Sequence, residues 1–250
     1  MTLQGKVALI AGGGRGIGAA TAKLLAARGA SVVVNYLKNS ASAEQVITRI
    51  RANGGQAIAV QANVRDAHQA ESLVQEALNA YGRIDILVNS TTPSGVFKPF
   101  EQISWDEFAQ GINNELKAAF MLTKAVLPTM QQQHYGRIIY IASGLAKVPS
   151  MDGAISIGTA KNGLVAFTKY IAKEYGPSGI TANIVSPGMV ETELSAMVPA
   201  EYKQRVAAIA PLRRIAQPED IARAIAFFAS DDSGFMTGTY APVNGGMAMD

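Results

Sequence analysis

The sequence predicts an α/β fold: a doubly wound, parallel sheet of seven strands flanked by helices, in a single domain that spans residues 1–250. Short runs rich in β-branched residues alternate with segments of helical periodicity along the whole chain. The strand-like runs are continuously apolar, as in a sheet that helices cover on both faces. The length of 250 residues, without a repeat or an evident linker, is common for one α/β domain.

The expected elements follow one another in strict alternation. Strands are expected at 7–11, 31–35, 57–60, 84–88, 137–142, 181–185 and 240–243. Helices are expected at 17–28, 41–53, 67–81, 114–132, 158–175 and 218–230. Repeated strand–helix alternation implies parallel strands joined by crossover helices.

Composition excludes several classes of protein. Hydrophobic residues make up 48% and charged residues 16%, against about 25% charged residues in an average protein. This excludes a disordered chain and a coiled coil, and it suggests surface buried between subunits. The absence of cysteine excludes disulfides and thiolate metal sites. The only histidines, His68 and His134, are expected at the surface, so no metal site is expected.

The charge pattern bears on partners and location. The net charge of +3 comes from dispersed residues without a basic block, so a nucleic-acid groove is not expected. No apolar run reaches the roughly 18 residues of a membrane helix. The first residues lack the apolar core of a signal peptide. We therefore expect a cytoplasmic enzyme or binding protein that acts on a small molecule.

Small and polar residues follow six of the expected strands. Ligands of doubly wound sheets bind beyond the carboxyl ends of the strands, where these residues lie. The pattern favours a binding site over ordinary polar loops. The residues are the glycine loop 12–18, Asn35, Asn63, the run 89–92, Ser143 with Gly144, and the run 186–188.

The segment 11–18 reads Ala-Gly-Gly-Gly-Arg-Gly-Ile-Gly and joins an apolar strand to a helix. Glycine permits positive φ angles and lets backbone N–H groups approach a ligand closely. The following helix N-terminus offers free N–H groups and a partial positive charge. The segment therefore predicts a site for the pyrophosphate of a dinucleotide.

The glycine spacing at 12, 16 and 18 resembles that of the short-chain dehydrogenase/reductase family, and other motifs extend the resemblance over essentially the whole chain. These motifs are Ile-Asp-Ile-Leu-Val-Asn at 84–89, Gly-Arg-Ile-Ile-Tyr-Ile-Ala-Ser at 136–143, the helix of Lys161, Asn-Ile-Val-Ser-Pro-Gly at 183–188, Pro-Leu-Arg-Arg at 211–214 and Asn-Gly-Gly at 244–246. Within that family the chain looks most like the 3-oxoacyl-carrier-protein reductases of bacteria. The resemblance implies a Rossmann-type fold that binds NAD(P).

The end of the second strand predicts which nicotinamide cofactor is bound. NAD-binding proteins usually carry an acid there that bonds the ribose 2′-hydroxyl. Here the sequence is Asn35-Tyr36-Leu37-Lys38, without an acid, and Arg15 lies in the glycine loop. A 2′-phosphate would meet Arg15, Asn35 and Lys38 without repulsion, so we expect NADP(H) rather than NAD(H). The resemblance implies the same role for Arg15.

The resemblance implies further cofactor contacts. Asn63 stands where the family often has aspartate near the adenine. Asn89 matches the first residue of the family's Asn-Asn-Ala-Gly, while Ser90, Thr91 and Thr92 replace the others. The segment 189–211 resembles the family's substrate lid. The remaining residues with implied contacts are Gly12, Gly14, Gly16, Ile17, Gly18, Val64, Lys161, Pro187, Gly188, Val190 and Thr192.

The catalytic positions depart from the family, which uses Tyr-x-x-x-Lys on one helix together with Ser and Asn. Ser143 and Lys161 match the pattern. Ile157 stands at the tyrosine position and has no proton to give. Glu115 stands at the asparagine position. Asn114 precedes it, but one step along a helix turns a side chain by about 100°.

Two roles for Glu115 stay open. Burial could raise its pKa and make it the proton donor, or it could form a salt bridge with Lys161 or another cation. Without the tyrosine, Lys161 can still bond the ribose hydroxyls. Tyr140 is expected in the core, and Tyr170 lies more than two helical turns beyond Lys161, so neither replaces the missing phenol.

Three functions remain open. The first is an NADP(H)-dependent carbonyl reductase, of the 3-oxoacyl type, with a modified mechanism. The second is a catalytically silent cofactor-binding subunit or sensor. The third is a non-redox enzyme, such as an isomerase, dehydratase or cyclase, that reuses the pocket. The resemblance also implies a homotetramer formed through the helices near 114–132 and 158–175 and the C-terminal segment.

Overall fold

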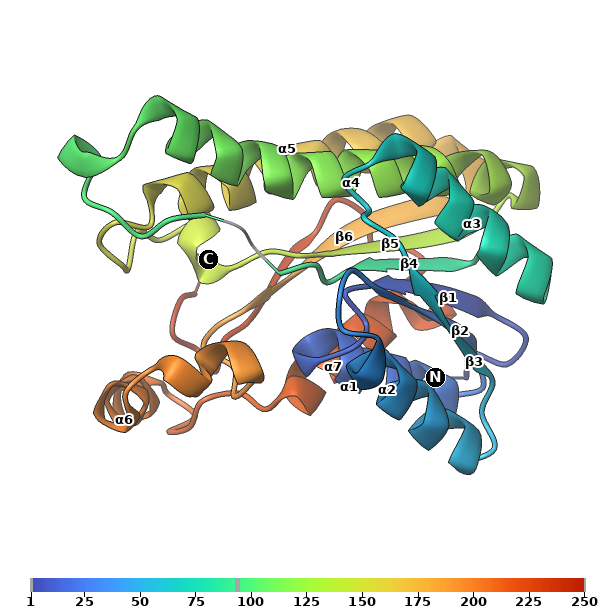
Figure 1. Cartoon of the computed structure of the whole chain (residues 1–250), viewed down its shortest axis with the longest axis horizontal. Helices are drawn as coiled ribbons and strands as arrows, with labels where there is room; N and C mark the ends of the chain where they lie inside the picture. Colours follow the sequence, from blue (N-terminus) through green and yellow to red (C-terminus); the bar gives the residue numbers. More distant parts are fainter. Residues whose placement is uncertain (1, 93–94, 250) are drawn as a thin grey trace.

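The computed structural model describes residues 2–92 and 95–249, which form one sheet of seven parallel strands between two layers of helices (Figure 1). The strands are β1 (Val7–Ala11), β2 (Ser31–Tyr36), β3 (Ala57–Gln61), β4 (Ile86–Asn89), β5 (Gly136–Ile141), β6 (Ile180–Pro187) and β7 (Tyr240–Val243). Their order across the sheet is β3-β2-β1-β4-β5-β6-β7. The predicted fold class is confirmed.

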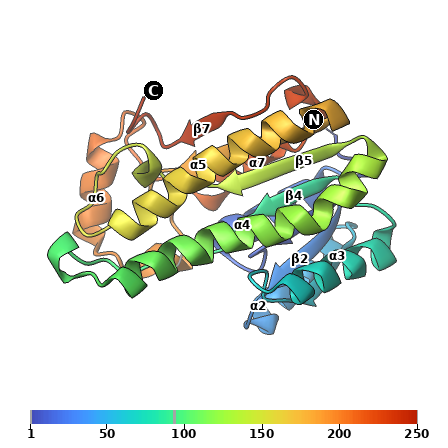
Figure 2. The same ribbon diagram turned by 90° about the horizontal axis from the view of Figure 1, so that it is seen from above.

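The helices cover both faces of the sheet. They are α1 (Gly16–Ala27), α2 (Ser40–Ala52), α3 (Ala67–Tyr81), α4 (Trp105–Gln133), α5 (Ile155–Tyr175), α6 (Ala200–Ile209) and α7 (Pro218–Phe228). The helices α3, α4 and α5 lie over one face, with α4 and α5 side by side, and α1, α2 and α7 lie under the other (Figures 1 and 2). No helix within residues 2–92 and 95–249 has the length and apolarity needed to cross a bilayer.

The apolar strands bury residues on both faces of the sheet. In β1, Leu9 and Ala11 contribute to the core beneath α3, α4 and α5, whereas Ala8 and Ile10 contribute to the core against α1, α2 and α7. All four side chains have no solvent exposure. A strand that is buried on both faces reads as an uninterrupted apolar run, which is why the sequence identified these strands.

Two helices differ from the sequence expectation. The helix α4 begins at Trp105 rather than near 114, because Ser104 and Glu107 form a capping box. The Ser104 hydroxyl accepts from the Glu107 N–H at 3.2 Å, and the Glu107 carboxylate accepts from the Ser104 N–H at 3.0 Å. The helix α6 lies within the segment expected as a lid and was not predicted as a helix.

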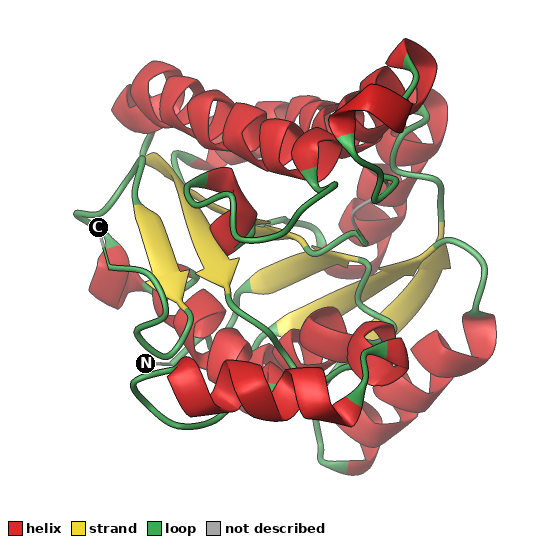
Figure 3. Ribbon diagram, turned by 90° about the vertical axis from the view of Figure 1, so that its left-hand side faces the viewer, coloured by secondary structure: helices red, strands yellow, loops and turns green. Residues whose placement is uncertain are grey.

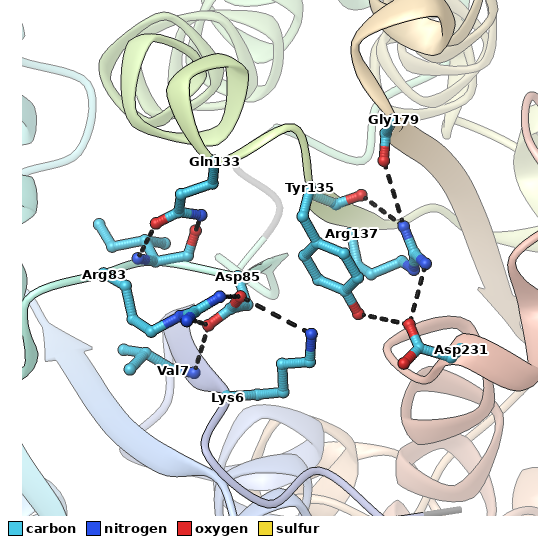
Figure 4. Close-up of polar contacts among 11 residues, drawn as sticks. Lys6, Val7, Arg83, Asp85, Gln133, Tyr135, Arg137, Gly179 and Asp231 are labelled. Atoms are coloured by element: carbon cyan, nitrogen blue, oxygen red, sulfur yellow. Dashed lines mark hydrogen bonds and ion pairs between the residues drawn. The ribbon is translucent and has the colours of Figure 1, made fainter.

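A charged network fixes the edge of the sheet where the strands begin (Figure 4). The fully buried Asp85 precedes β4. Its carboxylate accepts from the Val7 N–H at 2.9 Å and from two Arg83 nitrogens at 2.8 and 2.6 Å. Nearby, Tyr135 and Arg137 both donate to Asp231, at 2.9 and 3.1 Å. Burial raises the pKa of the Tyr135 phenol.

The opposite edge of the sheet, where the strands end, is the edge at which a ligand is expected. Because β1 lies between β2 and β4, the strand order reverses beside β1. Figure 3 shows the yellow strands of the sheet between the two layers of red helices. In doubly wound sheets, ligands bind at this reversal, beyond the carboxyl ends of the strands.

Candidate active site

The glycine loop after β1 packs against the loop after β4. Gly12 has φ +72°, and a Cβ added there would lie 2.5 Å from the Ser90 carbonyl oxygen. A Cβ at Gly18 would lie 2.2 Å from the Gly12 oxygen. These contacts are shorter than any side chain tolerates, so both positions require glycine.

The start of α1 has no side-chain cap, and the Glu193 carboxylate lies near it, 3.6 Å from where a Cβ at Gly16 would be. Arg15 is the N-cap residue but makes no side-chain cap, and the first turn contains no acid. The first N–H groups of a helix have no partner within the helix and attract phosphate. A Cβ at Gly16 (φ +50°) would lie 3.3 Å from the methyl group of Thr192. Thr192, expected at the cofactor, therefore lies over the first turn of α1, which also contains Ile17 and Gly18.

A cavity of about 320 Å³ lies beside the glycine loop. Three cationic side chains, Arg15, Lys38 and Arg65, line it, and no Asp or Glu is among its lining residues. A cation-rich wall without acids fits an adenosine that carries an additional phosphate. The other lining residues are Gly12, Gly14, Asn35, Tyr36, Leu37, Asn39, Ser42, Ala62, Asn63, Val64, Thr91 and Thr92.

The Asn35 amide is turned differently from the expectation. The side chain is buried, and its NH₂ group donates to the carbonyl oxygens of Ala62 at 3.0 Å and Val60 at 3.3 Å. These bonds hold the end of β2 against β3. Asn35 lines the cavity, but its NH₂ group is bonded to main-chain oxygens within the sheet, so of the three residues predicted for the 2′-phosphate Arg15 and Lys38 remain as donors.

The two other predicted asparagines shape the loops that carry them. The side-chain Oδ1 of Asn63 accepts from the Arg65 N–H at 3.1 Å, which makes a tight turn after β3. Asn89, at the end of β4, is buried, and its side-chain Oδ1 accepts from the Thr91 hydroxyl at 2.9 Å. Val64 is buried beside Asn63. All three lie at the carboxyl edge of the sheet, as predicted.

The helices α4 and α5 bring Glu115 and Lys161 together. The Lys161 ammonium lies 2.7 Å from a Glu115 carboxylate oxygen and 2.7 Å from the Ile141 carbonyl oxygen at the end of β5. Both side chains are only 4% exposed. Of the two roles left open for Glu115, the structure shows the salt bridge. Its direct action as an acid remains untested.

Ile157, expected at the family's tyrosine position, lies on α5. Four residues before Lys161, it is on the same helix face, and it is 8% exposed. A Cβ added at Gly95 would lie 2.9 Å from an Ile157 side-chain carbon and 3.0 Å from the Ser156 hydroxyl. The Ser156 hydroxyl is buried and has no hydrogen-bond partner within the described residues. The main chain at Gly95 therefore covers an apolar position.

Ser143 follows β5, and its hydroxyl accepts from the Leu145 N–H at 3.3 Å. Its carbonyl oxygen accepts from the hydroxyl of Tyr240 at 3.3 Å, and that hydroxyl also lies 2.7 Å from the Ser186 hydroxyl. The strands β5, β6 and β7 are thus tied together beneath Ser143. The role of Tyr240 was not predicted, because the sequence does not indicate which distant residue a tyrosine in a strand will contact.

Neither of the other two tyrosines considered can supply a proton at this site. Tyr140 is fully buried, as expected, and its hydroxyl lies 2.5 Å from that of Thr123 on α4. Burial raises the pKa of the Tyr140 phenol. Tyr170 is 66% exposed near the far end of α5. Within the described residues, no cluster of three or more His, Asp or Glu could hold a metal ion.

The segment after β6 runs from the sheet to the predicted lid. The Gly188 N–H, after Pro187, donates to the Val243 carbonyl at 3.2 Å, and Val190 pairs with Ala216. Beyond Thr192, a short 3₁₀ turn and α6 make up most of the segment expected as a lid (Figure 1). Met197 on this segment is 93% exposed.

An ion pair lies between the predicted lid, which ends near residue 211, and α7. The two Arg214 guanidinium nitrogens lie 2.5 and 3.0 Å from the Asp220 carboxylate. The Arg214 hydrogen bonds lower the pKa of Asp220 to about 2. Asp220 also accepts from the Gln217 N–H at 2.8 Å at the start of α7, so the lid returns to the body of the protein at a fixed point.

Comparisons with known proteins agree with this geometry. A family model described as enoyl-(acyl carrier protein) reductase matches residues 11–248. A 3-oxoacyl-[acyl-carrier-protein] reductase from Synechocystis is 40% identical over 250 residues, which are 99% of this chain and 98% of the relative. One from Escherichia coli is 35% identical over the full length of both chains. The solved structure of a short-chain dehydrogenase/reductase from Serratia marcescens has a TM-score of 0.91 at 33% identity, with complete coverage of both chains.

The parallel sheet and the glycine loop that leads into α1 have the arrangement of dinucleotide-binding proteins. With these relatives over its whole length, the chain belongs to the short-chain dehydrogenase/reductase family, on the branch that resembles the 3-oxoacyl-[acyl-carrier-protein] reductases.

The Glu115–Lys161 pair makes a prediction about stability. Glu115→Ala leaves a buried ammonium without its counter-ion and is expected to lower the free energy of unfolding by about 3–5 kcal/mol. The double variant Glu115→Leu/Lys161→Met, which buries no charge, is expected to be more stable than the single variant. Urea denaturation measures both.

The matched control is Glu191→Ala, which breaks a more exposed pair with Lys203. It is expected to cost about 0–1 kcal/mol. A Glu115→Ala variant as stable as this control would show that the buried pair contributes nothing to the fold.

Proposed function

We propose that this protein is an NADP(H)-dependent carbonyl reductase of the 3-oxoacyl type that works without the family's tyrosine. The observation that carries the proposal is the retained pair of Ser143 and Lys161 at the carboxyl edge of the sheet, the same edge that carries a cavity lined by cations and no acids. The names of the curated relatives support the substrate class.

The chain's own residues would hold the cofactor at three points. Arg15 and Lys38 bind the 2′-phosphate, which disfavours NAD(H). The first N–H groups of α1 bind the pyrophosphate. Lys161 bonds the nicotinamide ribose. An ammonium has three donors, and Glu115 and Ile141 already accept two of them, so one N–H is left for the ribose unless the Glu115 contact opens.

When bound, the nicotinamide exchanges a hydride with the carbonyl carbon of the substrate. The Ser143 hydroxyl donates a hydrogen bond to the carbonyl oxygen and orients it. The proton for that oxygen comes from a water molecule, and the hydroxide that is left is neutralised by the solvent. General acid catalysis typically contributes about 10²–10⁴ in rate, so the loss of the phenol makes this a slow reductase.

The lid favours an apolar substrate. Leu194 and Met197 are largely exposed on it, and methionine adapts to varied apolar surfaces. On α5, Ile157 offers hydrocarbon in place of the family's hydroxyl.

A second candidate is a cofactor-binding subunit or sensor without redox activity. Two observations favour it: the salt bridge to Glu115 occupies a donor of Lys161 that the reaction would use, and the buried Ile157 supplies no proton. A non-redox isomerase, dehydratase or cyclase would use the same pocket.

Cofactor preference tests the binding half of the proposal. Calorimetric titration is expected to show tighter binding of NADPH than of NADH. Arg15→Gln is expected to weaken NADPH binding about 10- to 100-fold, as for the loss of a charged hydrogen-bond partner, and to leave NADH nearly unchanged. Lys23→Gln, on the same helix but outside the cavity lining, is the control. Tighter binding of NADH would overturn the assignment of NADP(H).

Restoring the phenol tests the chemical half. Ile157→Tyr places a hydroxyl on the helix face of Lys161 and is expected to raise NADPH oxidation by a 3-oxoacyl thioester at least tenfold. Ile157→Phe adds the same bulk without the proton and is the matched control. Equal rates for the two variants would contradict the hypothesis that the pocket lacks only a proton donor. No oxidation by the unmodified protein across a carbonyl panel would favour the silent subunit.

We propose a homotetramer as the assembled state. Phe120 on α4 and Tyr170 on α5 are exposed apolar side chains, as are Met247 and Met249 in the C-terminal segment. Exposed aromatic and Met side chains are typical of subunit interfaces. Light scattering at micromolar concentration is expected to give four times the chain mass, and a monomer would exclude the proposal.

A further inference from the structure

The turn that follows β5 carries Ser143 at its start. Ser143 is the N-cap of a short 3₁₀ turn over Gly144–Ala146. Its hydroxyl oxygen accepts from the Leu145 N–H at 3.3 Å, and its carbonyl oxygen accepts from the Ala146 N–H at 2.9 Å. A hydroxyl that accepts one hydrogen bond still has its own proton to donate. The turn therefore leaves Ser143 able to donate to a carbonyl oxygen, which is its role in the proposed reaction.

Tyr240 contacts this turn from another strand. It begins β7, the edge strand of the sheet, which pairs with β6 (Figure 2). The Tyr240 hydroxyl donates to the Ser143 carbonyl oxygen at 3.3 Å and lies 2.7 Å from the hydroxyl of the buried Ser186 on β6. The Ser143 carbonyl oxygen thus accepts from its own turn and also from a side chain 97 residues further along the chain.

The aromatic ring of Tyr240 makes a second contact with the turn. The Lys147 ammonium lies 5.0 Å from the centre of the Tyr240 ring. Lys147 is the C-cap of the 3₁₀ turn that Ser143 begins. A cation within about 6 Å of an aromatic face is attracted to it. Tyr240 therefore contacts both ends of the turn, the first through its hydroxyl and the last through its ring.

The turn has few other contacts that fix its position. Of the residues Gly144–Ala146, only Ala146 is buried, so apolar packing contributes little to where the turn lies. The direction of the Ser143 hydroxyl depends on that position. A misplacement of about 1 Å in a reacting group can cost about 100-fold in rate. A side chain that holds the turn at both ends therefore affects how well Ser143 meets its substrate.

We propose that Tyr240 is a positioning residue for the reduction: its hydroxyl and ring hold the turn 143–147 so that the Ser143 hydroxyl is aimed at the carbonyl oxygen of the substrate. This inference rests on the proposed carbonyl reduction. Tyr240 acts through the main chain of Ser143 and transfers no proton itself. Because Ile157 has no hydroxyl, the reaction depends more strongly on the placement of Ser143.

The kinetic test uses Tyr240→Phe, which removes the hydroxyl and keeps the ring. The kcat for NADPH oxidation by a 3-oxoacyl thioester is expected to fall about 3- to 10-fold, as for the loss of one hydrogen bond. The Kd of NADPH, measured by calorimetry, is expected to stay unchanged, because the turn does not line the cationic cavity. In a Ser143→Ala background the same substitution is expected to leave the residual kcat unchanged, since Tyr240 acts through Ser143.

The matched control is Tyr135→Phe, which removes a phenol that is bonded to Asp231 at the opposite edge of the sheet. It is expected to leave kcat unchanged. Lys147→Met, which removes only the contact with the ring, is the second variant and is expected to lower kcat about 2- to 5-fold. Thermal unfolding of each variant checks that the fold is retained.

Hydrogen exchange followed by mass spectrometry tests the contact without turnover. The N–H groups of residues 145–148 are bonded within the turn, to Ser143 and Gly144. In Tyr240→Phe these amides are expected to exchange about 3- to 10-fold faster, because the turn opens more often. In Tyr135→Phe they are expected to exchange as in the unmodified protein.

The outcomes separate the two proposals. If the unmodified protein oxidises NADPH with no carbonyl compound, the proposed reduction fails, and the role of Tyr240 falls with it. If the unmodified protein is active and Tyr240→Phe has the same kcat, only the role of Tyr240 is overturned. An equal loss of kcat with and without Ser143, or unchanged exchange of residues 145–148, would also overturn that role alone.

Discussion

The contact of Lys161 with Glu115 and Ile141 is the interaction around which this site is organised. It joins α5, α4 and the end of β5 at one ammonium group, in a place from which water is nearly excluded. A buried ammonium needs its partners, because an unpaired buried charge is strongly destabilising. The pair therefore fixes where the helices α4 and α5 meet the sheet, and it also determines how much of Lys161 is left for a ligand.

The two ends of the candidate site differ in their electrostatics. At the adenosine end, Arg15, Lys38 and Arg65 line a cavity with no acid among its lining residues, so the charge is left for a ligand to neutralise. At the other end, the charge of Lys161 is already neutralised by Glu115, and Ile157 adds a hydrocarbon surface. This arrangement supports strong binding of an anionic nucleotide together with weak acid catalysis.

Much of the fold could be predicted because its signals are local. A continuously apolar run such as β1 indicates a strand buried on both faces, and the glycines at 12, 16 and 18 indicate the turn into α1. The predicted start of α4, near residue 114, was wrong, although the sequence contains the capping box of Ser104 and Glu107 that begins the helix at Trp105. The helix α6 was missed because none of its residues is buried, so it shows no apolar stripe facing a core.

The sequence by itself determined the order of strands and helices, the glycine loop, the acid-free end of β2 and the absence of a phenol at 157. Each of these depends on residues that are adjacent or separated by a helical turn. Only the tertiary structure decided that Glu115 pairs with Lys161, that the Asn35 amide serves β3, and that Arg65 and Tyr240 reach the site. These contacts join residues far apart in the chain, and their geometry follows from how the helices pack on the sheet.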